Sequence, residues 1–156
     1  MELIEGVLVD MAPIGSRHAG CRNWLNHRLH VDLLGRVLIG VQNPLALPGS
    51  ELYPDLMVLR RREDFYGRAH PGPEDVLLLV EVADSSLAAD RRVKVPLYAR
   101  HGIRQVWLVD LESETVEDYR QPAAAGYGEA RTLRRGDTLT AEAFPELKIS
   151  VADVLG

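Results

Sequence analysis

The sequence has only one cysteine, Cys21, among its 156 residues. A lone cysteine excludes an intrachain disulfide and a structural zinc site built on thiolates, and it makes a reducing compartment the simplest setting. The chain also lacks an apolar run near the roughly 18 residues of a membrane span, and its N-terminus, MELIEGVLVD, is acidic where a signal peptide is basic. We therefore expect a cytoplasmic protein with no membrane partner.

Positive charge is also scarce, since the net charge is −5 and the pI is about 5.5. Proteins that coat DNA nonspecifically usually carry a broad basic face, so this balance argues against that class. It is compatible with a nuclease, because carboxylates around a metal make a site acidic and local basic runs can still contact phosphates. Such runs are Arg60 to Arg62, Arg91 with Arg92, and Arg131 with Arg134 and Arg135, although any one run is more often a solvated surface.

Length and composition are those of an ordinary globular protein. A chain of 156 residues is near the commonest domain size and buries roughly 70% of its unfolded surface. Hydrophobic residues make up 46% and charged residues 26%, which argues against disordered and fibrous classes. We predict a single domain that spans residues 1–156.

The N-terminal part predicts a short hairpin or bent strand followed by a helix. Apolar and polar residues alternate over residues 3–11 around Glu5-Gly6. Residues 17–34 carry a helical apolar stripe, for which Ser16 offers an N-cap and Gly35 a stop. We expect the first of two main helices there.

The middle of the chain predicts a strand, a helix and a second strand. VLLLVEV at 76–82 is apolar enough to be buried on both faces, an amphipathic helix with Pro96 inside it follows at 90–101, and QVWLVDL begins at 105. This order implies a parallel strand pair within a central mixed sheet, and so an α/β or α+β fold. Further strands are expected at 36–42, 53–59, 115–120 and 128–134, with a short closing element at 147–154.

Two acidic residues stand where strands begin or end. Glu81 lies near the end of the most apolar strand, and Asp55 follows Pro54 where another strand begins. Burying an unpaired carboxylate costs several kcal/mol, so Glu81 needs a cation, a hydrogen-bond network or water. The carboxylates of Asp55 and Glu81, with the main-chain carbonyl of Val82, are the hard oxygen ligands that Mg²⁺ prefers. We predict that these three residues bind Mg²⁺ or Mn²⁺, which can activate water for phosphodiester hydrolysis.

Lys94 lies on the helix after Glu81. Only two of the 18 basic residues are lysines, Lys94 and Lys148, so arginine is the usual cation of this chain. A compact ammonium can hold or polarise an attacking water as a point charge. The simpler interpretation is a helical ion pair with Asp90, worth about 0.3–0.5 kcal/mol, and Asp90 is also placed to orient the ammonium.

Three stretches of the sequence resemble a known family. They are LIEGVLVDMAP with His18, YPDLMVL, and LLVEVADSSLAADRRVKVPLYARHGIRQVWLVD. They are similar to the Uma-two family of the restriction-endonuclease-like, or PD-(D/E)xK, nuclease superfamily. The resemblance covers roughly residues 2–120 and is strongest from 76 to 110. It implies a nuclease core with a central mixed sheet flanked by two main helices, in which Asp55 and Glu81 bind a divalent metal.

The resemblance also bears on the remaining site residues. The superfamily usually has a lysine two residues after the second acid, and here that position is Ala83. The similar family carries its lysine on the next helix, which corresponds to Lys94. Glu5 matches an early acid of the family, as a further ligand or a supporting group. His18 becomes a candidate base or phosphate contact.

Several assignments stay open at this stage. Tyr98, one helical turn beyond Lys94, either faces the site or packs in the core. A thiol nucleophile formed by Cys21 and His18 is disfavoured, because no third orienting group is visible. Substrate contact and helix capping are both open for Asp84, Ser85 and Ser86.

We predict a metal-dependent endonuclease that hydrolyses phosphodiester bonds in DNA, with RNA left open. The alternative is a catalytically inactive nuclease-fold interaction or nucleic-acid-binding protein, which the acidic net charge favours. An edge strand from the 105–120 hairpin or from the tail would pair two copies into a homodimer.

Overall fold

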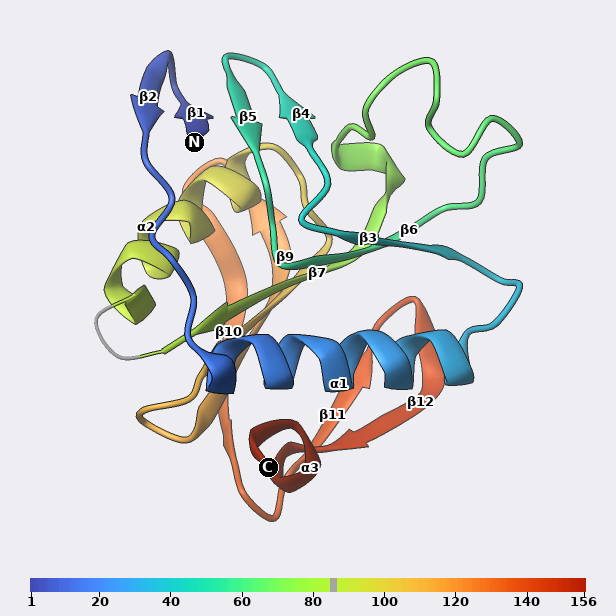
Figure 1. Cartoon of the computed structure of the whole chain (residues 1–156), viewed down its shortest axis with the longest axis vertical. Helices are drawn as coiled ribbons and strands as arrows, with labels where there is room; N and C mark the ends of the chain where they lie inside the picture. Colours follow the sequence, from blue (N-terminus) through green and yellow to red (C-terminus); the bar gives the residue numbers. More distant parts are fainter. Residues whose placement is uncertain (85–86) are drawn as a thin grey trace.

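The structure is a computed structural model that describes residues 1–84 and 87–156, and its centre is a six-stranded sheet in the order β10-β9-β8-β7-β6-β3 (Figure 1). The strands are β3 (Leu38–Val41), β6 (Leu56–Leu59), β7 (Val76–Ala83), β8 (Gln105–Asp110), β9 (Thr115–Ala123) and β10 (Gly126–Arg134). β7 and β8 are parallel and every other pair in this sheet is antiparallel. This confirms the mixed sheet, and it confirms that the two strands before and after the helix in the sequence form a parallel pair.

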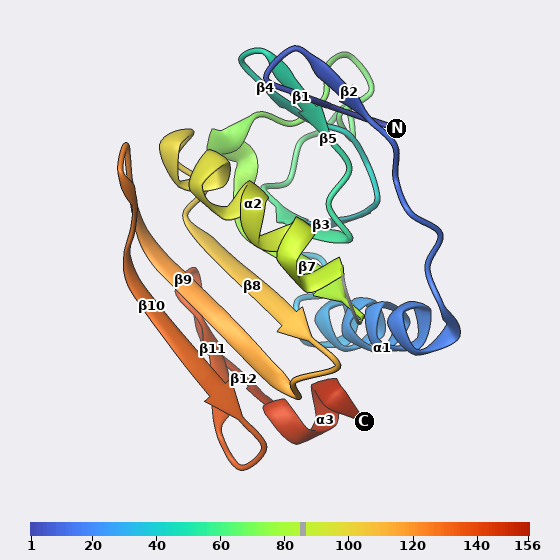
Figure 2. The same ribbon diagram turned by 90° about the vertical axis from the view of Figure 1, so that its left-hand side faces the viewer.

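One main helix covers each face of this sheet (Figure 2). Every residue of β7 is buried, so alternate side chains enter two different cores. Leu78 and Val80 pack in the cluster that includes Leu25 of α1 (Ser16–Asp32). On the other face Leu79 packs in the cluster that includes Tyr98 of α2 (Leu87–Arg100). The expected two-helix arrangement around a central sheet is therefore confirmed.

A second, four-stranded sheet lies above the α2 side, in the order β2-β1-β5-β4 (Figure 1). Its first hairpin was expected: Glu5 and Gly6 have φ of +48° and +82°, the signs that a two-residue type I′ turn requires. The pairing of residues 43–52 as strands was not expected, because two prolines and a glycine there indicate turns. The strands are β1 (Glu2–Ile4), β2 (Val7–Val9), β4 (Leu45–Leu47) and β5 (Ser50–Leu52).

The C-terminal segment covers the α1 side of the main sheet. It holds an antiparallel pair and a short helix in place of the one short closing element expected at 147–154. Its elements are β11 (Thr138–Ala141), β12 (Phe144–Ser150) and α3 (Val151–Leu155), and the remaining short element is the 3-10 turn η1 (Pro73–Asp75). Among the helices that the structure describes, none is long and apolar enough to cross a membrane.

Three details of the sequence prediction were wrong. Ser16 is the first residue of α1 and not its cap, because Gly15 holds the extended N-cap conformation, with φ −83° and ψ 173°. The helix ends at Asp32, two residues earlier than expected. The 105–120 hairpin is not an edge, since β7 pairs with β8 and β10 pairs with β9.

Candidate active site

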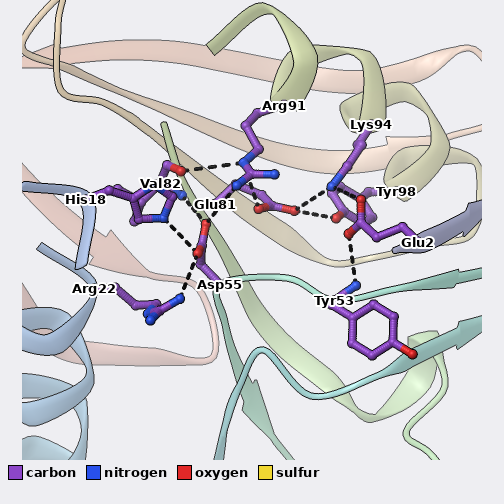
Figure 3. Close-up of polar contacts among 10 residues, drawn as sticks. All are labelled: Glu2, His18, Arg22, Tyr53, Asp55, Glu81, Val82, Arg91, Lys94 and Tyr98. Atoms are coloured by element: carbon purple, nitrogen blue, oxygen red, sulfur yellow. Dashed lines mark hydrogen bonds and ion pairs between the residues drawn. The ribbon is translucent and has the colours of Figure 1, made fainter. Parts of the chain in front are cut away.

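Asp55 is a buried carboxylate between the sheet and α1 (Figure 3). Its Oδ2 accepts a 2.9 Å hydrogen bond from the main-chain N–H of Val82, so the start of β6 is tied to the end of β7. Its Oδ1 lies 2.9 Å from His18 Nε2, which must be the donor because an ionised carboxylate only accepts. Burial raises the pKa of Asp55, but His18, the Val82 N–H and Arg91 outweigh burial, so this pKa lies below its ordinary value. Asp55 is therefore held ionised.

Glu81 is a second buried carboxylate, on the α2 side of β7. Its Oε1 accepts a 2.6 Å hydrogen bond from the Tyr98 hydroxyl. Its Oε2 is buried and has no hydrogen-bond partner within residues 1–84 and 87–156. Burial raises the pKa of Glu81 to about 7, despite the opposing charge of Lys94. At neutral pH this carboxyl is poised between its acid and its ionised form.

Arg91 joins the two carboxylates. Its Nη2 lies 3.8 Å from Asp55 Oδ2 and its Nε lies 3.5 Å from Glu81 Oε2. Its Nε is also 3.5 Å from the main-chain oxygen of Val82. All three distances exceed the usual hydrogen-bond range, so the guanidinium is held mainly by charge. Because one guanidinium reaches both acids, their carboxyl groups lie in one small region at the end of the β6–β7 pair.

Lys94 is buried beside the same acids, with 6% of its surface exposed. Its Nζ lies 3.9 Å from Glu81 Oε1 and 2.6 Å from Glu2 Oε2. Glu2 is itself 4% exposed, and its other oxygen accepts the main-chain N–H of Tyr53 at 3.0 Å. The nearest partner of the ammonium is therefore a carboxylate on β1, and Glu81 is its second.

The structure thus brings together Asp55, Glu81, Val82, Lys94 and Tyr98, with His18 behind Asp55 (Figure 3). It leaves Glu5 outside this buried group: the Glu5 side chain is 62% exposed and forms an ion pair with Arg100. The possible helix-capping serines, Ser85 and Ser86, and the side chain of Asp90 lie outside the described residues. Asp84 has an intermediate exposure and stands near Gly15, on the segment before α1.

Sequence reasoning missed two contributors to this group. Arg91 was counted only as part of a basic run, but Arg91, Lys94 and Tyr98 stand at i, i+3 and i+7, which is the spacing of one helical face. That spacing was available in the sequence. Glu2 carried a weaker signal, because strand alternation puts it on the same side of β1 as Ile4. Its pairing with Lys94 joins positions 92 residues apart, 94 − 2 = 92, and no local pattern specifies it.

Cys21 belongs to the core and not to a catalytic group. It is 8% exposed, and its Sγ lies 3.4 Å from the main-chain oxygen of Val154. Burial raises the pKa of the thiol to about 12. Because only the thiolate is a good nucleophile, this environment supports the rejection of a cysteine mechanism.

A cavity of about 500 Å³ lies beside Arg91 and Lys94, although Asp55 and Glu81 are not among the residues that line it. Most of its lining residues belong to α2 and to the chain that runs from the β1–β2 hairpin toward α1, two segments whose course Figure 2 shows. Its polar and charged lining residues are Glu2, Glu5, Asp10, Gln42, Arg91, Lys94 and Arg100. Its size is in the range of small-molecule sites, so a substrate group can approach Lys94 through it. Apolar members of its lining include Val7, Val9, Met11, Ile14, Val93 and Leu97.

No three His, Cys, Asp or Glu side chains within residues 1–84 and 87–156 are grouped as a metal-binding set. The carboxylates of Asp55 and Glu81 and the main-chain carbonyl of Val82 do lie together around Arg91. Mg²⁺ commonly binds only one or two protein carboxylates and keeps several waters. The buried Glu81 Oε2 accepts no hydrogen bond within the described residues and has only Arg91 Nε at 3.5 Å, so it keeps a lone pair that a metal ion could use. The donor set is thus hard and fits a divalent ion of this kind.

A mixed sheet flanked by two helices is a fold that this chain shares with a solved structure. The crystal structure titled as that of "a putative nuclease belonging to DUF820" from Anabaena variabilis ATCC 29413 has a TM-score of 0.78 at 17% identity, with 99% of this chain and 88% of that chain covered.

The family follows from the sequence itself. The sequence model of the Uma2 family, described as "Putative restriction endonuclease", matches residues 1–152, so the chain belongs to that family. No curated protein matches the chain. The expected resemblance and the expected fold class are both confirmed.

Proposed function

We propose that this chain is a metal-dependent endonuclease that hydrolyses phosphodiester bonds in DNA. One observation carries the proposal: Asp55 and Glu81, each about 1% exposed, both approach the guanidinium of Arg91, with the ammonium of Lys94 3.9 Å from Glu81. Buried acids of this kind are expensive unless they serve a bound cation or a network. Family membership supports the same reaction class.

In this proposal Asp55, Glu81 and the Val82 carbonyl hold Mg²⁺ or Mn²⁺. A bound ion of this type lowers the pKa of water and stabilises charge on a phosphoryl oxygen. His18 keeps Asp55 ionised through its 2.9 Å hydrogen bond, and Tyr98 fixes the orientation of Glu81 through its hydroxyl. Both residues therefore act through the acids that they contact.

Lys94 supplies the positive charge for the reaction. Hydrolysis adds the oxygen of water to phosphorus, breaks one P–O ester bond and places a proton on the leaving oxygen. The ammonium can hold the attacking water or offset the charge that develops on the phosphate. Glu2 fixes this side chain at 2.6 Å, and Lys94 lines the cavity by which a phosphate would enter.

The direct test is plasmid cleavage. Supercoiled DNA incubated with the protein and Mn²⁺ should be nicked or linearised, whereas Glu81→Gln and Lys94→Met should lose at least about a hundredfold in rate, as for removal of one charge-stabilising group. Glu142→Gln is the matched control, since it removes an acid from the exposed pair with Arg104. Cleavage that survives in both site variants would overturn the proposal. The same assay on a structured RNA decides between the two substrates.

The position of Arg91 supports a second candidate, a nucleic-acid-binding protein that keeps the nuclease fold without its chemistry. The guanidinium approaches both acids and so partly neutralises the pair without a metal. Calorimetry separates the candidates: heat of Mn²⁺ binding that vanishes in Asp55→Asn supports the endonuclease. No heat at millimolar Mn²⁺, together with retained DNA binding, supports the binding protein.

We also propose a homodimer formed through β10. This strand is one edge of the six-stranded sheet, and an edge presents unpaired main-chain groups to a second copy. Light scattering after size exclusion should give about twice the 17.3 kDa of one chain. A mass of 17.3 kDa at micromolar concentration would exclude the dimer.

A further inference from the structure

The loop between β6 and β7, residues 60–72, presents one aromatic side chain to solvent. Phe65 is 72% exposed. The loop stands at the far end of the β6–β7 pair from Asp55 and Glu81, beyond the β4–β5 hairpin (Figure 1). A single exposed apolar residue is common on protein surfaces, so exposure alone assigns no role. Two further features of the loop set Phe65 apart.

The first feature is the main-chain conformation. Phe65 and its neighbour Tyr66 have φ of +52° and +61°, in the left-handed region that bulky residues rarely adopt. Gly67 comes one position later, so glycine does not relieve either of them. Backbone held in such a conformation persists only when its surroundings fix it, and it is concentrated at functional sites.

Asp64 fixes this conformation. Its carboxylate accepts main-chain N–H groups from Tyr66 at 3.2 Å and from Arg68 at 3.3 Å. It also accepts two hydrogen bonds from the Arg62 guanidinium, at 3.1 and 3.0 Å, and that guanidinium lies 4.4 Å from the centre of the Tyr66 ring. The loop is therefore a built turn that displays Phe65 in one direction.

The second feature is charge. Residues 60–72 contain four arginines and two acids, a balance of +2 in a chain of net charge −5. Asp64 is already paired with Arg62. Arg61 donates to a main-chain carbonyl, that of Gly35, and the Arg68 side chain makes no polar contact within the described residues. Arg61 and Arg68 thus belong to the same loop as Phe65 and have no carboxylate partner among those residues.

We propose that the loop of residues 60–72 is a second DNA contact, in which Arg61 and Arg68 bind backbone phosphates and Phe65 packs against a base step of the duplex. Cations next to a projecting apolar side chain are the combination by which proteins hold DNA and wedge its bases. The inference rests on the proposed function, since it takes DNA as the substrate.

The geometry allows one duplex to reach both places. β6 has four residues, and at about 3.3 Å per residue it separates the loop from Asp55 by roughly 13 Å. That is about four base-pair steps at roughly 3.4 Å each. β6 and β7 are themselves buried, so a duplex held at the loop would pass over the surface of the protein and come level with the site within a few base pairs.

Fluorescence anisotropy with a labelled 25-base-pair duplex, in EDTA to prevent cleavage, tests the proposal. Phe65→Ala and Arg68→Ala should each weaken binding about tenfold, and Phe65→Trp should restore it with a tryptophan emission that DNA quenches. The salt dependence should distinguish the two roles: Arg68→Ala lowers the slope of log K against log salt by about 0.9, and Phe65→Ala leaves it unchanged. Leu8→Ala, another exposed apolar residue at 67%, is the matched control.

Each other outcome is decisive. If Phe65→Ala binds DNA as tightly as the wild type, the loop proposal is overturned. Continued plasmid cleavage would then still support the endonuclease. Phe65-dependent binding with no cleavage under any metal supports the loop and refutes the endonuclease. No DNA binding by the wild type refutes both. Loss of dimer mass in Phe65→Ala with unchanged DNA affinity makes the loop a contact between two copies of the chain instead.

Discussion

Lys94 Nζ lies 2.6 Å from Glu2 Oε2 and 3.9 Å from Glu81 Oε1, so one buried ammonium contacts a carboxylate of the four-stranded sheet and one of the six-stranded sheet. The contact joins the N-terminal strand to the central strand through α2. Buried ion pairs contribute little net stability, yet removing one partner leaves a charge uncompensated and costs about 3–5 kcal/mol. The pair therefore links the position of the candidate catalytic cation to the packing of the smaller sheet.

A double-mutant cycle on Glu2 and Lys94 measures this link. We expect Lys94→Met and Glu2→Gln each to destabilise the protein, and the double variant to lose less than the sum, with a coupling energy of about 1–3 kcal/mol in urea unfolding. The exposed Glu5–Arg100 pair is the control and should couple by less than about 1 kcal/mol. Coupling no stronger than that of the control would contradict the buried contact.

The pKa of Glu81 predicts how stability depends on pH. It rises from an ordinary value of 4.5 to about 7 on folding. Between these values the folded protein binds more protons than the unfolded chain, so stability falls as pH rises from about 4.5 to 7 and levels off above it. Glu81→Gln cannot titrate at this position. The difference in Tm, variant minus wild type, should therefore increase from pH 4.5 to 7, by about 2–4 °C for each kcal/mol of stability that the wild type loses. A constant difference from pH 4.5 to 8 in EDTA would contradict this prediction.

Tyr98→Phe removes the hydroxyl that donates to Glu81 Oε1 at 2.6 Å. The buried oxygen then loses its donor, which costs about 1–3 kcal/mol. The hydrogen bond lowers the pKa of Glu81, so the cost should be larger at pH 8 than at pH 5 in urea unfolding. Tyr53→Phe, which removes a half-buried hydroxyl bonded to Glu51, should cost less at both pH values.

Metal affinity should rise with pH if Glu81 is a ligand. The pKa of about 7 means that a bound cation must displace a proton below that pH. Calorimetric titration with Mn²⁺ should therefore show a weakening of up to about tenfold between pH 7 and pH 6. Proton release, seen as a heat that depends on the buffer, should accompany binding at pH 6. Affinity that does not change with pH would mean that Glu81 does not hold the metal.

The central unit could be predicted from sequence because its signals are local. β7 and β8 are largely apolar runs, and a helical segment that ends before Gly102 separates them. Of the smaller sheet only the first hairpin could be predicted, because its strands are only three residues long and β1 pairs with β5 at Leu3 and Glu51. Strands of that length are stabilised by distant partners and not by their own propensity.

The candidate site divides in the same way. Glu81 could be selected because a carboxylate inside an apolar strand requires compensation, and its burial bears that reasoning out. Asp55 was a candidate because a carboxylate where a strand begins can share a cation with Glu81, whereas Lys94 became one chiefly through the family resemblance. Glu2 could not be found, because its role depends on how the hairpin folds back onto α2.

Val82 donates its main-chain N–H to the side chain of Asp55 at 2.9 Å. This single amide is therefore a natural probe of the centre in solution. In an NMR titration its resonance should follow the ionisation of Asp55, and its rate of solvent exchange should increase once that carboxyl is neutralised. The chain thus contains a spectroscopic reporter that needs neither an attached dye nor a substrate.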